Sequence, residues 1–231
     1  FGAFLEVARY LKAHPLPYNA LFLADGAHHV ALAGARAFAA RHLVDVTGDK
    51  EKALKDEIAS YRAFIGLDLT SHTSTVGLFA KGWFYNQMTT TSENILLNQL
   101  ASYAKKVDDQ ADVLSKQWNV PSDAFYVDGI TGKQGRTWRS YLPSLVALDS
   151  EVATMAQLPG ISFATANDVR ELQDTPYDLP GQVEYSNLAS QVNTITSLLG
   201  LSGQSMPEMP SSGTFSANFG YIVANAISRD V

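Results

Sequence analysis

The chain has 231 residues and a formal net charge of −6 at pH 7, with no block of clustered Lys and Arg, which argues against nucleic acid as a main partner. A hydrophobic fraction of 46% and an aromatic fraction of 10% can fill a sizeable core, so global disorder is excluded. The absence of cysteine removes disulfides, thiolate metal sites and cysteine nucleophiles together.

Apolar spacing and turn residues predict helices and strands that alternate along the chain. The first part is expected to form a helix over 1–14, a buried strand over 18–26, a helix over 29–43 and a buried strand over 61–70. The second part is expected to form an amphipathic helix over 92–118, a helix over 150–157, a strand over 158–165 and a helix over 183–200 that Gly200 ends. This alternation predicts an α/β fold with a largely parallel sheet and helices on both of its faces.

The composition predicts one α/β domain over residues 1–200 and a different kind of segment over 201–231. That segment opens with a linker-like stretch, SGQSMPEMPSSG, and continues as an edge strand or the start of a following module. The chain begins with FGAFLEVARYLKAH, which resembles the middle of a helix, so we expect it to be cut from a longer protein. It contains no run of about 18 apolar residues, and no membrane span is expected within it.

A long polar stretch over residues 118–140 carries three large aromatic residues, Trp118, Tyr126 and Trp138. Aromatic residues are favoured at binding surfaces, so this stretch could form a lid or a contact surface. Large aromatic residues are equally common in cores, and the sequence leaves both readings open.

The stretch DGAHHVALAGAR carries two adjacent histidines at a predicted strand-to-helix turn. Together with two later segments, it resembles the family of di-zinc aminopeptidases. The family pattern at this turn is Gly-Ala-Glu-Glu, then one residue, Gly-Leu, one residue and Gly-Ser. Gly26, Ala27, Leu32 and Gly34 match it, whereas His28 and His29 stand in place of the glutamate pair.

The two later segments extend the resemblance over roughly Phe1 to Leu199. FIGLDLTS is similar to the family's strand that ends in a metal-binding aspartate, which places Asp68 at that position. The stretch from Leu148 to Val192 resembles the family's Ser-Asp-His segment, its next strand and its His-Thr-x-x-Asp motif. In that stretch Asp174 replaces the ligating histidine, Thr175 and Pro176 are kept, and the resemblance places Asp149, Ser150 and Asp178 in the cleft.

The resemblance implies a three-layer α/β/α fold with a mixed, mostly parallel central sheet, as in zinc exopeptidases. It places His28 at the position of the general base, where an imidazole can accept a proton but is shorter than glutamate and directed differently. It implies three candidate zinc ligands, His29, Asp68 and Asp174. The family's other ligands, a His-x-Asp motif and a bridging aspartate, would lie upstream of this chain.

These substitutions predict a non-catalytic aminopeptidase-like domain, a pseudo-peptidase without a cofactor, in a larger extracytoplasmic or membrane-anchored protein. By resemblance its partner would be a peptide, a protein or a glycolipid, bound in or near the altered cleft. The alternative is a zinc-dependent aminopeptidase with altered ligands whose remaining ligands lie upstream. A third interpretation is a spacer or assembly surface with no ligand in the cleft.

Ordinary structural roles stay open for the same residues. Adjacent histidines at a helix start are common without a function, and Asp68 and Asp174 can cap a following turn. His72, in the polar stretch TSHTST, is interpreted as a solvated loop residue. Other chemistries lack their motifs, because GKQGR is not a complete phosphate-binding loop and no Gly-x-Ser-x-Gly turn occurs.

Overall fold

A computed structural model of the chain describes residues 1–28, 30–44, 62–83, 93–132, 136–155, 158–173 and 175–202. Within them, one four-stranded sheet has the order β1-β4-β2-β3. The strands are β1 (Phe64–Asp68), β2 (Val76–Phe79), β3 (Tyr126–Asp128) and β4 (Gly160–Thr165). β1 pairs with β4 and β2 pairs with β3 in parallel, whereas β2 and β4 are antiparallel. The predicted α/β class with a mixed, mostly parallel sheet is therefore confirmed.

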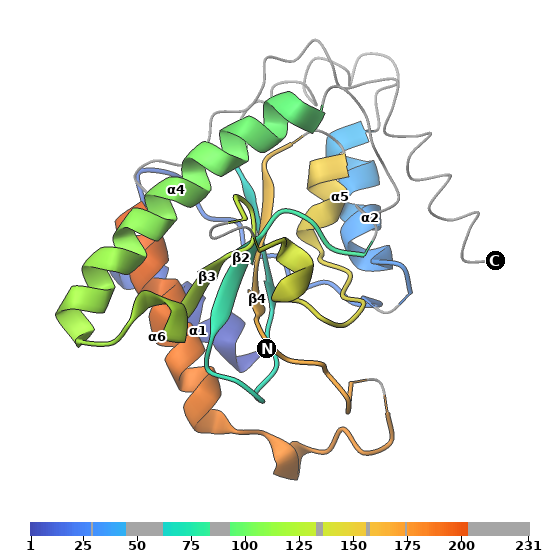
Figure 1. The fold of residues 1–231 in the computed structure, drawn as a ribbon. Helices are drawn as coiled ribbons and strands as arrows, with labels where there is room; N and C mark the ends of the chain where they lie inside the picture. Colours follow the sequence, from blue (N-terminus) through green and yellow to red (C-terminus); the bar gives the residue numbers. More distant parts are fainter. Residues whose placement is uncertain are drawn as a thin grey trace.

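The helices gather on two sides of these strands (Figure 1). They are α1 (Gly2–Ala13), α2 (Ala33–Ala39), α4 (Glu93–Trp118), α5 (Ser150–Met155) and α6 (Tyr185–Ser202). A π-helical turn, Ala40–Val44, continues α2. α1 and α4 pack on α6, and α5 packs on β4, β1 and α2. Short 3-10 turns lie at Ser122–Ala124, Trp138–Ser140 and Pro180–Gln182.

Two buried clusters cover the two faces of the sheet, because successive strand residues point to opposite sides. In β2, Leu78 belongs to the cluster formed with α4 and α6, whereas Phe79 belongs to the cluster formed with residues 141–148. In β4, Phe163 and Ala164 divide between the same two clusters. Both faces of these strands are therefore buried, which explains why their sequences are apolar runs and do not alternate.

Two sequence predictions fail in this fold. The run 18–26, predicted as a buried strand, forms no strand, and Leu21, Phe22 and Leu23 are exposed. α6 continues through Gly200 to Ser202, so the predicted stop at Gly200 is wrong. At Gly200 the helix lies close to the Tyr10 hydroxyl of α1. Packing against α1 and α4 decides the length of α6 and outweighs the local preference of one glycine.

The three aromatic residues of the 118–140 stretch pack in or against the core, and a lid or contact surface formed by this stretch stays a prediction. Tyr126 is a buried residue of β3, and the Trp118 ring packs edge-on against Phe125 with 4.9 Å between ring centroids. Trp138 packs on the cluster of the opposite face.

Among the described helices, none has both the length and the apolar character that crossing a bilayer requires.

Candidate functional site

The carboxyl ends of β1 and β4 bring several polar residues together. These two strands are adjacent and parallel, with Asp68 paired in register to Ala164, so the loops that follow them leave the same edge of the sheet. Ligands of α/β proteins commonly bind at such an edge. α6 fixes the loop after β1: the Gln191 side-chain amide donates to the Thr70 carbonyl at 2.9 Å, and that of Asn187 donates to the Ser71 carbonyl at 2.8 Å.

An ion pair between Asp68, the last residue of β1, and Arg170, in the loop after β4, joins the carboxyl ends of the two strands. The Arg170 Nη1 group donates to Asp68 Oδ1 at 2.7 Å, and its Nη2 group reaches the Asp68 backbone carbonyl at 3.3 Å. The side chains are 2% and 17% exposed for Arg170 and Asp68, respectively. The carboxylate that the resemblance assigns to a metal is thus bound by a guanidinium group of the chain itself.

Asp168 connects the loops after the two strands. Its Oδ1 accepts the Arg170 backbone N–H at 3.0 Å, and its Oδ2 interacts with the Thr70 hydroxyl and with His72 Nδ1. Burial raises the pKa of Asp168, but these hydrogen bonds and the nearby imidazole outweigh burial, so the pKa is lowered overall. His72 thus lies in a loop with its side chain 38% exposed, as the sequence predicted, and the contact of Nδ1 with Asp168 anchors its ring.

His28 lies beside three carboxylates. Its Nδ1 is 3.0 Å from Asp149 Oδ1, and Asp25 and Asp68 are close enough to act on it electrostatically. The hydrogen bond to Asp149 raises the pKa of His28, burial opposes this, and the charges of the three carboxylates add to the increase. Burial and the charge of Asp149 also raise the pKa of Asp25. The raised pKa means that the site stabilises the imidazolium form, in which Nδ1 donates a hydrogen bond to Asp149.

A strained turn presents His28. Ala27, Ala31 and Leu32 all have positive φ angles, of 57°, 50° and 55°, which cost energy in residues with a side chain. Backbone bonds from Leu32 to His28 and from Ala33 to Ala27 close the turn, and the Leu32 side chain is buried. Packing of Leu32 and these bonds therefore hold the turn in place.

The His28–Asp149 contact predicts a pH-dependent contribution to stability. Because the folded pKa of His28 is raised, the contribution is complete below the unfolded pKa of about 6.5 and is lost as pH rises through the folded pKa. The stability advantage of wild type over Asp149→Asn should therefore be largest near pH 5.5 to 6 and decline towards about pH 8.5. Urea unfolding at several pH values measures it, with Asp178→Asn as the control. Parallel pH curves for wild type and Asp149→Asn would contradict this role of the pair.

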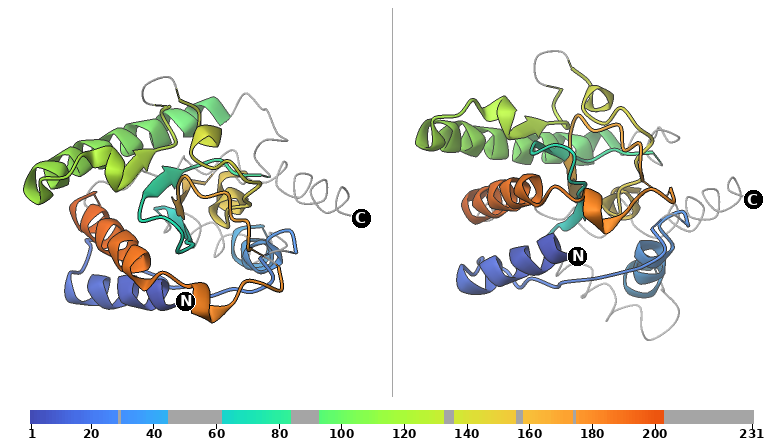
Figure 2. Two further views of the ribbon diagram at one scale, coloured as in Figure 1. Left: turned by 60° about the horizontal axis from the view of Figure 1, so that its bottom comes forward. Right: turned by 90° about the horizontal axis from the view of Figure 1, so that it is seen from below.

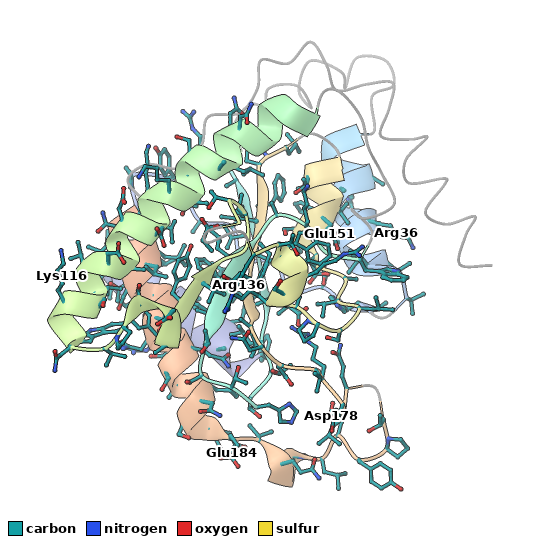
Figure 3. The ribbon with its side chains drawn as sticks, in the orientation of Figure 1. Arg36, Lys116, Arg136, Glu151, Asp178 and Glu184 are labelled. Carbon is teal, nitrogen blue, oxygen red and sulfur yellow. The ribbon has the colours of Figure 1, made fainter. Side chains whose placement is uncertain are left out.

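The structure places the sequence-predicted residues differently. His28, Asp68 and Asp149 come together, but Ser150 is buried, with its hydroxyl 2.6 Å from that of Ser162 in β4. Asp178 is exposed in the loop before α6. Figure 3 shows it far from Glu151, the neighbour of Ser150 in α5. His29 and Asp174, two of the three candidate zinc ligands, lie outside the described residues, as does nearly all of the 201–231 segment.

The described donor groups do not fit a zinc centre. Asp68 is bound to Arg170, and the described residues include no group of three or more His, Asp or Glu side chains placed to hold a metal ion. The complete set of His29, Asp68 and Asp174 stays a prediction. Arg170, Asp168 and Thr70 did not emerge from sequence reasoning. The only signal in the sequence was an aspartate at or just after the end of each of two apolar strands, Asp68 and Asp168. This pattern does not reveal that Arg170 binds both aspartates.

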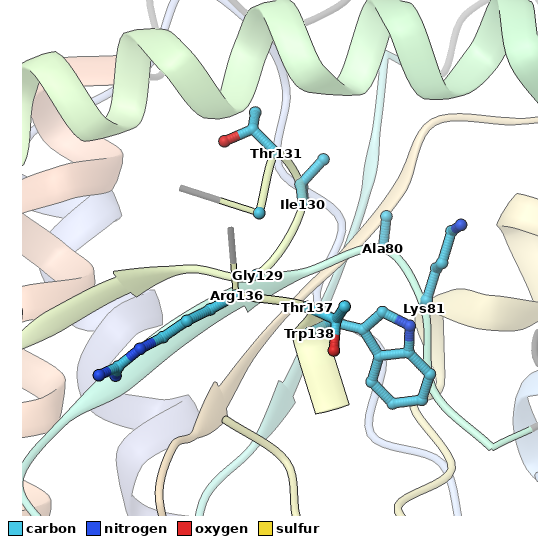
Figure 4. A pocket seen from close by; sticks show the side chains of 9 residues that line it. Ala80, Lys81, Gly129, Ile130, Thr131, Arg136, Thr137 and Trp138 are labelled. Carbon is cyan, nitrogen blue, oxygen red and sulfur yellow. The ribbon is translucent and has the colours of Figure 1, made fainter. Parts of the chain in front are cut away.

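A separate cavity of about 340 Å³ lies at the carboxyl ends of β2 and β3, at the opposite edge of the sheet (Figure 4). It is lined by Ala80, Lys81, Gly129, Ile130, Thr131, Gly132, Arg136, Thr137 and Trp138. In Figure 4 the Arg136 side chain points away from Lys81 and Trp138, so its charge does not converge with theirs on one ligand position. The cavity therefore adds no group to the cluster around His28.

A scan against protein-family models gives no match for this chain, and searches of curated proteins and of solved structures match nothing either.

Proposed function

We propose that the chain is a non-catalytic domain of the zinc-exopeptidase type, with a three-layer α/β/α fold, which binds a peptide or protein partner at the carboxyl ends of β1 and β4. A glycolipid is the other ligand class that the resemblance suggests. The supporting observation is the Asp68–Arg170 ion pair, because a guanidinium group occupies one oxygen of the carboxylate that a peptidase of this type would use for a metal. On this proposal, the parent protein is extracytoplasmic or anchored to a membrane.

The energetics of the pair support the loss of metal binding. A metal bound to Asp68 Oδ1 would have to displace Arg170, whose side chain is almost fully buried. A metal bound to Oδ2, which is buried and has no hydrogen-bond partner, would lie next to the guanidinium charge and be repelled by it. Separating a buried ion pair leaves a charge without compensation and costs about 3–5 kcal/mol, which weakens any metal site built on this carboxylate. A peptide ligand does not require this displacement, because it can hydrogen-bond to the polar groups that remain at the edge.

The state of His28 supports the same conclusion. A peptidase needs a group that takes a proton from the attacking water, and its pKa should lie near the working pH. The Asp149, Asp68 and Asp25 carboxylates stabilise the protonated imidazole instead. In that form the imidazole donates hydrogen bonds, and on this proposal His28 holds a ligand in place.

The metal content of the purified protein tests the proposal. A working structural or catalytic zinc site normally holds close to one equivalent of zinc. Because we propose that this chain has no such site, we expect wild type purified without added zinc to hold less than about 0.1 equivalent. Inductively coupled plasma mass spectrometry on wild type and His29→Ala measures this. About one equivalent in wild type that is lost in His29→Ala would overturn the proposal and favour the zinc-aminopeptidase alternative. Hydrolysis of aminoacyl substrates that depends on this zinc would establish the alternative.

A further inference from the structure

The run 19–25 (Asn-Ala-Leu-Phe-Leu-Ala-Asp), which we call the apolar run, is exposed on the surface of the molecule. Leu21, Phe22 and Leu23 are 66%, 40% and 44% exposed. Among the described residues, no backbone group of residues 16–24 takes part in a hydrogen bond. In Figure 2 the trace between α1 and α2 crosses the molecule as a long open stretch. Unpaired backbone next to exposed apolar side chains provides a template for pairing with another strand.

The residues on either side of the apolar run lie near β1. Among the described strands, β1 is the first in the order and has a partner on one side only. At the start of the run, the Arg62 guanidinium, two residues before β1, lies over the Tyr18 ring at 5.7 Å. At its end, His28 is close enough to feel the charge of Asp68, the last residue of β1. The residues that flank the run therefore lie near the two ends of β1, in the order in which β1 runs.

Aromatic side chains of α1 extend this apolar surface. Phe1 stacks on Phe4 with ring centroids 6.0 Å apart, and Phe4 meets Phe22 edge-on at 5.6 Å. Phe1 is 82% exposed, and Leu5 on the same helix is also exposed. Contiguous exposed apolar patches are uncommon on monomeric proteins and mark interaction surfaces.

The sequence of the apolar run is compatible with pairing to itself. Residues 15–24 contain no charged side chain, so two copies would meet there without like charges opposite each other. In an antiparallel pair centred on Phe22, Leu21 lies opposite Leu23 and Ala20 opposite Ala24. Asn19 then lies opposite Asp25, and its amide can donate to the carboxylate. A two-fold contact of this kind is self-complementary by symmetry.

We propose that the apolar run is a homodimer interface, at which two copies of this chain pair antiparallel about a two-fold axis at Phe22. This proposal goes beyond the proposed function: none of its residues belongs to the Asp68–Arg170 pair, and the run shares with the candidate site only Asp25, whose charge acts on His28. The contact buries Leu21 and Leu23 of both copies and pairs backbone groups that make no hydrogen bond to any described residue of the same chain. The dimer should strengthen as salt is added, since salt screens the repulsion between two molecules that each carry a charge of −6.

Sedimentation velocity over about 5 to 200 µM protein, at low and high salt, tests the proposal on the whole chain. Wild type should pass from monomer to dimer in this range. Leu21→Lys should raise the dissociation constant at least about tenfold, because it removes apolar contact and places a charge at the interface twice. Leu145→Lys is the matched control, since Leu145 is 76% exposed outside the apolar run, and it should dimerise like wild type. Circular dichroism melting checks that each variant is folded.

Charge pairing tests the register. In the proposed antiparallel pair, Leu21→Lys combined with Leu23→Glu places opposite charges across the interface, and it should restore the dimer that Leu21→Lys loses. Leu21→Lys combined with Leu23→Lys should stay monomeric. A wild type that is monomeric throughout the range would overturn the proposal, as would a dimer that Leu21→Lys leaves unchanged. Failure of the Lys–Glu combination to restore pairing would overturn the antiparallel register.

Discussion

Replacing Arg170 with methionine is expected to destabilise the protein by about 3–5 kcal/mol, since it leaves the Asp68 carboxylate largely buried without its cation. The pair is almost fully shielded, with 2% of Arg170 and 17% of Asp68 exposed, so water replaces little of the lost interaction. The guanidinium also holds the Asp68 backbone carbonyl, and the loops after β1 and β4 would lose this connection as well. Urea unfolding at neutral pH measures the change.

A double variant separates the ion pair from general damage to the fold. Asp68→Asn combined with Arg170→Met removes both charges, and it should be less destabilised than the sum of the single variants. The exposed pair of Arg9 and Glu6 is the control, because its side chains are 72% and 46% exposed. Arg9→Met should change stability by no more than about 0.5 kcal/mol. An equally small loss for Arg170→Met would mean that the pair does not hold this edge together.

Replacing Phe79 with alanine is expected to cost about 3–5 kcal/mol, as truncation of a fully buried aromatic ring leaves a cavity. Phe79 is 0% exposed at the end of β2 and lies in the cluster on the α5 side of the sheet. Its ring fits against two glycines: a Cβ atom at Gly129 would lie 2.2 Å from the ring, and one at Gly77 would lie 2.4 Å from it. Thermal and urea unfolding measure the loss.

The same contact predicts a reversal of sign in a double-mutant cycle. Gly129→Ala in wild type should destabilise by about 1–3 kcal/mol, because the added methyl group overlaps the Phe79 ring. In the Phe79→Ala background the ring is gone, and Gly129→Ala should be neutral or stabilising, since it partly fills the cavity. Equal effects in both backgrounds would show that something other than the Phe79 ring requires glycine at this position.

The sequence indicated part of the candidate site. Resemblance singled out His28, Asp68 and Asp149, and the structure brings these three together at one edge of the sheet. The resemblance did not single out Arg170, although this residue forms the ion pair with Asp68. The two lie 102 positions apart, and their contact exists only because β1 and β4 are neighbours in the sheet. A charge partner of this kind depends on strand order, which local sequence does not contain.

Local sequence determined the helices and the two longer strands of this protein. α4 and β4 were predicted from residue spacing, because the helical period and a long apolar run are properties of neighbouring residues. Tertiary structure alone decided the short strands and the unpaired apolar run. β2 and β3, with four and three residues, are too short to show a pattern, and they form by pairing with each other and with β4. The run 18–26 has the composition of a strand but forms none, because a strand is stabilised by hydrogen bonds to a neighbour, and among the described residues no such bond joins residues 16–24 to a strand.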